Sequence, residues 1–253
     1  MMEKQKITQS PLATLYEVTY KSASYSVKGC LGIPAKPGTY PGILYLRGGL
    51  KKVGMVKQDW IKELTQQGYV VFAPYYRGNA GGEGKEDFCG NDREDAVQAF
   101  DVLANVAETA NQDLHVMGFS RGAVMALFTA MERNVSSVIV WGGVSDMRLT
   151  YEERPDLRRM LRRVTGGTPD VKPRAYQWRT PLHDIVHIHV PVFIIHGEKD
   201  EHVSIEHAYR LERALYERGQ PVKTLFYPEM PHHFSEDAKR YVMQQIAQWI
   251  QGI

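Results

Sequence analysis

The chain lacks the features that mark several large classes of protein. It has only two cysteines, Cys30 and Cys89, which favours a reducing compartment over a secreted, disulfide-bonded fold. No apolar run approaches the length of a membrane-spanning helix. The first six residues, MMEKQK, are charged and lack the apolar stretch of a signal peptide. We therefore expect a cytoplasmic protein.

An excess of charge of one sign is also missing. The 31 lysines and arginines nearly balance the 29 acidic residues, so no strong field attracts nucleic acid or an anionic membrane. Hydrophobic residues make up 43% of the chain, which is enough for a substantial core. No internal repeat or low-complexity segment divides the 253 residues. We expect a single domain over residues 1–253.

Strand-like and helix-like segments alternate along the chain. Two alternating segments at 15–20 and 25–33 predict an antiparallel pair at the N-terminus. Further strands are predicted at 43–46, 69–73, 113–118, 137–141, 192–195 and 223–227, and helices at 57–67, 92–110, 121–133, 205–218 and 235–250. This alternation predicts an α/β fold with a mainly parallel, doubly wound sheet of about eight strands and an antiparallel N-terminal edge. Residues 145–185 break the rhythm and predict a small cap inserted over the sheet.

The most informative motif is Gly118-Phe119-Ser120-Arg121-Gly122. It follows the predicted strand at 113–118 and leads directly into the predicted helix at 121–133. A strand that ends in G-x-S-x-G and turns at once into a helix is the nucleophile elbow of α/β-hydrolases, where a tight turn raises the serine above the sheet edge. This context predicts that Ser120 is a catalytic nucleophile.

A serine nucleophile needs a base, and the base needs a carboxylate that holds its tautomer and stabilises its cation. In this fold the chain order is Ser, then Asp or Glu, then His, each in a loop after a strand. Asp200 follows the predicted strand at 192–195, and His232 and His233 follow the strand at 223–227. The sequence therefore predicts a triad of Ser120, Asp200 and one of these two histidines.

Three further segments resemble the catalytic domain of prolyl-oligopeptidase-like serine hydrolases. Residues 74–82 are similar to the family's N-Y-R-G-S-x-G-Y-G loop. Residues 196–203 match H-G-x-x-D-x-x-V, which implies that Asp200 is the acid. Residues 231–235 match a G-H-G-F ending, which implies that His232 is the base. The resemblance covers nearly the whole chain and implies an α/β-hydrolase fold.

Two departures limit what this resemblance carries over. The family's peptidases have a β-propeller or another added domain, for which this chain has no room. Arg47 stands where relatives usually have histidine or a tyrosine whose hydroxyl helps to bind the oxyanion. The first oxyanion donor is expected to be the backbone N–H of Arg121. Because losing one donor typically costs about 10²–10³ in rate, we expect the Arg47–Gly48–Gly49 turn to supply the second, through a backbone N–H or the Arg47 guanidinium.

Alternative interpretations of the three site residues stay open. Ser120 could be a structural serine in an ordinary strand-to-helix turn. Asp200 could cap the helix predicted to begin near residue 205, as carboxylates commonly do. His233 could be the base with His232 structural, because a boundary error of one residue is common in such assignments.

Other polar residues have two interpretations each. Six arginines between residues 148 and 163 could bind an anionic group of the substrate, although a solvated helix face is the simpler interpretation. Arg77 could contact substrate or form an internal salt bridge that fixes its glycine-rich loop. His187 and His189 alternate as metal ligands can, but no Cys, Asp or Glu accompanies them at ligand spacing.

The chemistry we expect is a two-step acyl transfer to water, with no metal or organic cofactor implied. The expected substrate is a small carboxylic ester or a short acyl-peptide. A small serine peptidase is the alternative, because the fold and the triad serve esters and peptides alike. A non-catalytic binding protein is a second alternative, and the complete set of three site residues argues against it.

Overall fold

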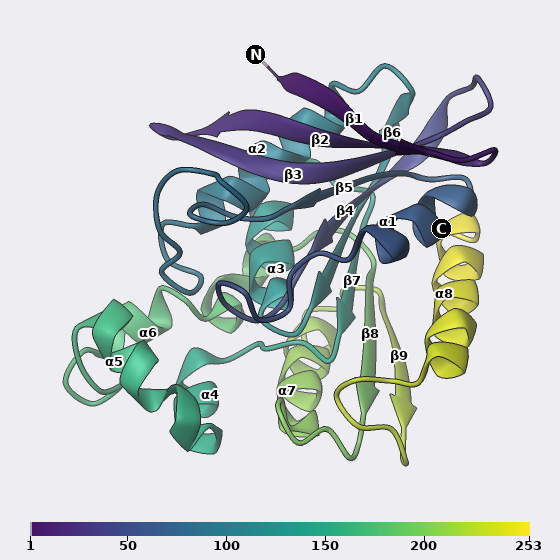
Figure 1. Cartoon of the computed structure of the whole chain (residues 1–253). Coiled ribbons are helices and arrows are strands. Elements are labelled where there is room, and N and C mark those ends of the chain that lie inside the picture. The colour runs from purple at the N-terminus through teal and green to yellow at the C-terminus, as the bar shows by residue number, and fades with distance from the viewer. Residues whose placement is uncertain (1) are drawn as a thin grey trace.

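Within residues 2–253, which a computed structural model describes, one mixed sheet of nine strands runs through the molecule (Figure 1). The strand order is β1-β2-β3-β5-β4-β6-β7-β8-β9. The pairs β1–β2, β2–β3 and β3–β5 are antiparallel, and every later pair is parallel. The strands are β1 (Glu3–Gln9), β2 (Ala13–Ser22), β3 (Tyr25–Pro34), β4 (Tyr40–Leu46), β5 (Val70–Pro74), β6 (Thr109–Phe119), β7 (Ser137–Trp141), β8 (Val192–Gly197) and β9 (Val222–Tyr227). The predicted fold class is confirmed.

Successive residues of the central strands enter two different apolar clusters, one on each face of the sheet. Ile43 and Phe193 belong to one cluster, and their neighbours Leu44 and Ile194 belong to the other. A parallel sheet covered on both faces is buried throughout. This explains why these strands read as continuous apolar runs in the sequence.

Helices cover both faces of the sheet (Figure 1). Apolar residues of α1 and α8 join the cluster that contains Ile43, whereas those of α2, α3 and α7 join the cluster that contains Leu44. These helices are α1 (Gln58–Gln66), α2 (Arg93–Ala104), α3 (Gly122–Glu132), α7 (Ile205–Tyr216) and α8 (Glu236–Gln251). None of the helices in residues 2–253 combines the length and apolar character that crossing a membrane requires.

The stretch between β7 and β8, all of it described by the structure, consists of short helices set beside the sheet (Figure 1). They are α4 (Met147–Glu153), η1 (Pro155–Leu157), α5 (Arg158–Thr165), α6 (Pro173–Gln177) and η2 (Pro181–His187). The Asp146 side chain caps α4 by accepting from two backbone N–H groups. Proline stands in the first turn of η1, α6 and η2, where its missing N–H does no harm. These helices occupy the segment at 145–185 that breaks the strand–helix rhythm.

Two elements differ from the prediction. Strand β1 was not predicted, and it raises the number of strands to nine. The helix predicted over 92–110 ends at Ala104, where the side chain of Asn105 donates to the Asp101 carbonyl at 2.7 Å. The chain then turns and enters β6 at Thr109, several residues earlier than expected.

Candidate active site

Ser120 lies in the tight turn between β6 and α3. Its backbone φ is 56°, in the left-handed region that is strained for residues other than glycine. The Ser120 N–H donates to the Trp141 carbonyl at 3.0 Å, and the Ser120 carbonyl accepts from Ala123 N–H at 3.0 Å and Val144 N–H at 3.1 Å. The surrounding structure thus holds Ser120 in a conformation that the residue alone would not adopt.

Glycines allow this turn to pack closely. A Cβ atom on Gly118 would come within 2.4 Å of the Gly122 carbonyl oxygen. A Cβ atom on Gly122 would come within 1.9 Å of the Leu46 carbonyl oxygen, at the end of β4. Real Cβ atoms do not approach oxygen so closely, so both glycines of G-x-S-x-G are needed for the strand and helix to pack.

His232 and Asp200 form a hydrogen-bonded pair. His232 Nδ1 lies 2.6 Å from Asp200 Oδ2. Asp200 Oδ1 accepts from the backbone N–H groups of His202 and Val203, each at 2.8 Å. Burial acts to raise the pKa of Asp200, but hydrogen bonds from His196 and His232 outweigh it and hold this pKa well below its usual range. Asp200 therefore remains an anion beside the imidazole of His232.

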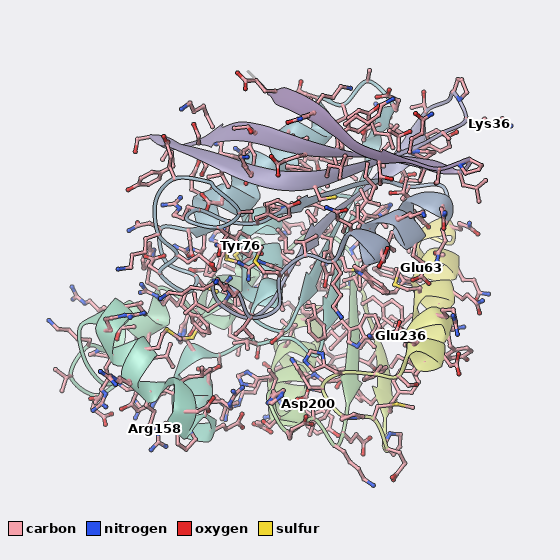
Figure 2. All side chains as sticks on the ribbon, viewed as in Figure 1. Lys36, Glu63, Tyr76, Arg158, Asp200 and Glu236 are labelled. Atoms are coloured by element: carbon pink, nitrogen blue, oxygen red, sulfur yellow. The ribbon has the colours of Figure 1, made fainter. Side chains whose placement is uncertain are left out.

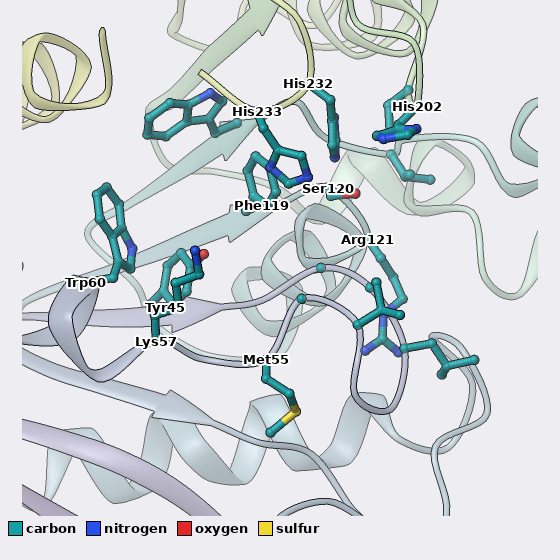
Figure 3. A pocket seen from close by; sticks show the side chains of 18 of the residues that line it. Tyr45, Met55, Lys57, Trp60, Phe119, Ser120, Arg121, His202, His232 and His233 are labelled. Atoms are coloured by element: carbon teal, nitrogen blue, oxygen red, sulfur yellow. The ribbon is translucent and has the colours of Figure 1, made fainter. Parts of the chain in front are cut away.

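The bond to Asp200 distinguishes the two neighbouring histidines. His232 is buried, and the tip of its ring points toward the Ser120 hydroxyl in Figure 3. His233 is exposed, and among the described residues its side chain has no carboxylate partner. The Phe119 ring lies against both imidazoles, with centroid separations of 4.9 Å and 5.6 Å. The structure thus brings Ser120, His232 and Asp200 to one place, with His232 as the histidine that contacts the acid.

One cavity of about 770 Å³ opens at this place, and Ser120, Arg121, His232 and His233 line it (Figure 3). Much of its wall is aromatic, contributed by Tyr45, Trp60, Phe88, Phe119, Trp141 and Phe234. Thr150, Arg154 and Leu157, from the segment between β7 and β8, line it as well. A cavity of this volume and character suits a small ligand that is largely apolar.

Charged side chains along α1 and at the start of α8 also line the cavity. They are Lys57, Asp59, Glu63, Glu236 and Lys239. Figure 2 shows Glu63 and Glu236 on the two facing helices. The Lys239 Nζ lies 2.7 Å from Glu236 Oε1, so part of this charge is compensated within the rim. This rim was not predicted from the sequence, because no spacing in the chain indicates that α1 and the start of α8 line the same cavity.

The predicted oxyanion donors adjoin Ser120. A Cβ atom on Gly48 would lie 2.7 Å from Ser120 Cβ, so the turn after β4 touches Ser120. Among the described residues, the backbone N–H groups of Gly48 and Arg121 have no protein acceptor. The Arg47 guanidinium, by contrast, is buried and donates to Glu86 and to backbone carbonyls. Both terminal nitrogens of Arg47 are thus engaged, whereas its Nε has no hydrogen-bond partner among the described residues.

A buried cluster of charges lies behind this turn, and it was not predicted. Glu86 accepts from Arg47 Nη2 at 3.0 Å and from Arg121 Nη2 at 2.6 Å. Both guanidinium groups lie over the Tyr76 ring, each 5.0 Å from its centroid. Burial acts to raise the pKa of Glu86, but the two arginines outweigh it and hold this pKa below its usual value. Glu86 is therefore an ionised carboxylate enclosed by donors.

Asp92 is a less well satisfied acid in the same cluster. Its Oδ2 accepts from Arg121 Nη1 at 3.3 Å, whereas its Oδ1 has no partner in the described part of the chain. Burial raises the pKa of Asp92 to about 7, and the nearby Asp87 carboxylate contributes to the rise. Asp92 thus exchanges a proton close to neutral pH.

Asp92→Asn is expected to change how stability depends on pH. In the unfolded chain this carboxyl titrates near 3.8, so between about pH 4 and pH 7 the folded state binds more protons. In the wild type, Asp92 therefore makes a contribution to the free energy of unfolding that falls as the pH rises through this window. The variant lacks that contribution, so its melting temperature relative to wild type should increase from about pH 4 to about pH 8. Asp101→Asn, which removes a partly exposed partner of Arg133, serves as the control. Parallel curves of melting temperature against pH for wild type and Asp92→Asn would contradict the expectation.

A second Ser–His–Asp chain lies toward the other end of the sheet. Ser137 Oγ is 2.8 Å from His115 Nδ1, and His115 Nε2 is 2.7 Å from Asp113 Oδ1. Ser137 and His115 are fully buried, and neither lines the cavity that holds Ser120. A substrate carbonyl cannot reach Ser137, so contact geometry of this kind does not by itself make a nucleophile.

The arginine-rich segment is mainly a solvated surface. Arg148 pairs with Glu152 at 3.0 Å, one helical turn away, and both side chains are more than half exposed. Arg154 pairs with Asp156 at 2.7 Å. The charges of these two arginines are compensated locally, which agrees with the simpler of the two interpretations, while Arg154 also lines the cavity.

Arg77 and the two alternating histidines lie outside the cavity wall. Arg77 forms a buried ion pair with Asp95 at 2.7 Å, which fixes the loop that follows β5. His187 and His189 are exposed. Within residues 2–253, no group of three or more His, Cys, Asp or Glu side chains is arranged to hold a metal ion.

Known proteins resemble this chain over different extents. Among curated proteins, the "uncharacterized peptidase YtmA" of Bacillus subtilis is 49% identical over 255 residues, covering 100% of this chain and 99% of the relative. The "uncharacterized peptidase YuxL" of the same organism is 28% identical and covers 83% of this chain. This chain spans only 34% of the length of YuxL.

Solved structures show the same fold. An acetyl xylan esterase from Paenibacillus sp. R4 superimposes with a TM-score of 0.79 at 14% identity, covering 98% of this chain and 88% of the esterase. The acylaminoacyl peptidase of Pyrococcus horikoshii superimposes with a TM-score of 0.78 at 17% identity, covering 98% of this chain and 41% of the peptidase. At these identities the likeness concerns the fold alone.

The fold defines the molecule as an α/β-hydrolase, and the match to a family of serine hydrolases extends over most of the chain. Residues 57–253 match the model of the prolyl oligopeptidase family. The chain belongs to this family, and it is a serine hydrolase, of the peptidase or esterase kind.

Proposed function

We propose that the chain hydrolyses a small carboxylic ester, or a short acyl-peptide, through a triad of Ser120, His232 and Asp200. The observation that carries the proposal is the 2.6 Å bond between His232 Nδ1 and Asp200 Oδ2, beside a cavity that Ser120 and His232 both line. We also infer that residues 145–185 act as a cap within a single domain, since three of their side chains line the same cavity.

The proposed reaction has two acyl-transfer steps. Ser120 Oγ attacks the substrate carbonyl while His232 Nε2 takes the hydroxyl proton, and Asp200 stabilises the imidazolium. The backbone N–H groups of Arg121 and Gly48 hold the negative oxygen of the tetrahedral intermediate. His232 then gives its proton to the leaving alcohol or amine, which leaves an acyl ester on Ser120. A water molecule attacks this ester in the same way and releases the acid.

The leaving group favours an ester as substrate. An alkoxide or phenoxide departs from the tetrahedral intermediate more readily than an amine, which must be protonated as it leaves. A peptidase therefore needs extra binding energy from subsites, usually including a fixed charge that anchors a free terminus of the substrate. The rim of this cavity carries both signs of charge, and Glu236 is already paired with Lys239. An amine at Glu236 would have to compete with that lysine, which leaves Asp59 and Glu63 as the acids of the rim with no ion-pair partner among the described residues.

The test compares an ester with an amide of the same acyl and aryl groups. We expect kcat/KM for p-nitrophenyl acetate to exceed that for p-nitroacetanilide, and for any neutral aminoacyl anilide, by at least about 10², or roughly 2.7 kcal/mol. Ser120→Ala gives the background rate to be subtracted from each. The family name favours a peptidase as the second candidate. An anilide that is turned over as well as the best ester would make that candidate the leading function.

A further inference from the structure

One buried carboxylate holds together the two segments that would supply the oxyanion donors. Glu86 Oε2 accepts from the Arg121 guanidinium at 2.6 Å, directly after the nucleophile. Glu86 Oε1 accepts from Arg47 Nη2 and from the backbone N–H of Lys51, each at 3.0 Å, in the turn after β4. Asn79 Nδ2 donates to the same oxygen at 2.5 Å. The Glu86 side chain is only 2% exposed, so water does not compete for these bonds.

The bonds in this cluster also set the direction of the Gly48 N–H. The Tyr76 hydroxyl donates to the Arg47 carbonyl at 3.3 Å, on the side where Glu86 and the guanidinium groups lie. In a planar trans peptide the C=O and the following N–H point in opposite directions. The Gly48 N–H therefore points away from the Tyr76 hydroxyl, and Gly48 itself lies against Ser120.

The direction of the second donor, the backbone N–H of Arg121, follows from the same peptide geometry. The Ser120 carbonyl accepts from Ala123 N–H and Val144 N–H, so the N–H of Arg121 in the same peptide points the opposite way. The Arg121 side chain is anchored by Glu86 and Asp92. Both donors are thus fixed before substrate arrives, and the link between their segments runs through Glu86.

We propose that Glu86 is the positioning residue of the oxyanion hole. The proposal rests on the function proposed above, in which the N–H groups of Gly48 and Arg121 bind the oxyanion. Glu86 does not touch the substrate. It holds the turn at 47–51 against the nucleophile turn, so that the two N–H groups converge on one oxygen, and this alignment is what the transition state requires.

The chemistry of the cluster makes Glu86→Gln an informative change. Each of the four groups that surround the carboxylate is a donor. The amide of glutamine has only one oxygen, so its NH₂ group must face either Arg121 or the group formed by Arg47, Lys51 and Asn79. One of the two segments is then released while the side-chain volume is kept.

The experiment measures turnover and the affinity for an oxyanion mimic separately. Ser120 Oγ adds to the carbonyl carbon of a trifluoromethyl ketone. The resulting adduct carries an anionic oxygen, which lies in the oxyanion hole. For Glu86→Gln we expect kcat for p-nitrophenyl acetate to fall by about 10², KM to stay within about threefold, and the affinity for the trifluoromethyl ketone to fall in parallel with kcat. Loss of one oxyanion contact acts on the transition state and not on ground-state binding.

Asp95→Asn is the matched control. Asp95 is also fully buried and surrounded by donors, from Arg77 and Ser22, but it contacts neither the turn after β4 nor Arg121. We expect it to lower the melting temperature about as much as Glu86→Gln while kcat and inhibitor affinity stay near wild type. If Glu86→Gln lowers kcat and inhibitor affinity no more than Asp95→Asn does, Glu86 is only structural and the proposal is overturned.

Tyr76→Phe keeps the test decisive if Glu86→Gln does not fold. It removes only the hydroxyl that turns the Arg47 carbonyl, and we expect kcat and inhibitor affinity to fall together by about fivefold. Unchanged values would overturn the proposal. A wild-type protein that neither hydrolyses the ester nor binds the ketone would instead reject the proposed function itself, so the two failures are distinguishable.

Discussion

Ser120→Ala is expected to reduce ester hydrolysis by about 10⁴- to 10⁶-fold in kcat, because removing the nucleophile of a triad leaves only the oxyanion hole and binding. Wild-type protein treated with a fluorophosphonate should gain the mass of one covalent adduct, located on the peptide that contains Ser120. The variant should gain none. The strained backbone at Ser120 and its place on the cavity wall support this expectation.

The matched control for the nucleophile is Ser137→Ala. Ser137 contacts a histidine that contacts an aspartate, as Ser120 is proposed to do, but it is buried away from the cavity. We expect this variant to be labelled and to hydrolyse esters as wild type does. An adduct at any residue other than Ser120, or no adduct on active protein, would contradict the proposed mechanism.

The second large effect is expected at the base. His232→Ala should lower kcat by about 10³-fold or more, because no other group would then take the proton from Ser120. His233→Ala should lower it by less than about tenfold, since His233 lies next to the site without contacting Asp200. The pair is well matched, as the two histidines are adjacent and both line the cavity. A reversal of the two effects would assign the base to His233.

The residues of the proposed triad could be named from the sequence because each lies in a short motif with a local structural meaning. The nucleophile-elbow motif at 118–122 and the motif at 196–203 can each be recognised from a short stretch of sequence. The central strands were predictable for a related reason, since burial on both faces requires continuous apolar runs. The central strands, which are encoded locally, were therefore recovered from the sequence, and the triad stays a proposal.

The features that were missed depend on contacts between distant segments. Strand β1 is exposed along its whole length, so it has no apolar alternation to reveal it, and only its pairing with β2 makes it a strand. Glu86 is one acidic residue in a loop rich in glycine and charge, and nothing nearby in the sequence marks it as buried. Its role follows from Arg47 and Arg121, which reach it from two other parts of the chain. The same reason explains why the charged rim around Glu63 and Glu236 was missed.

The position of the proposed acid and base at one side of the sheet is expected to affect how heat inactivates the enzyme. Asp200 and His232 follow β8 and β9, the last two strands in the sheet order, whereas Ser120 follows the central strand β6. β9 is an edge strand and is only partly buried, so it is among the first elements to open as temperature rises. Such opening would withdraw the proposed base from the nucleophile while most of the sheet stays folded. Turnover would then decline reversibly at temperatures below the unfolding midpoint, and the temperature optimum would report the stability of this edge and not that of the whole molecule.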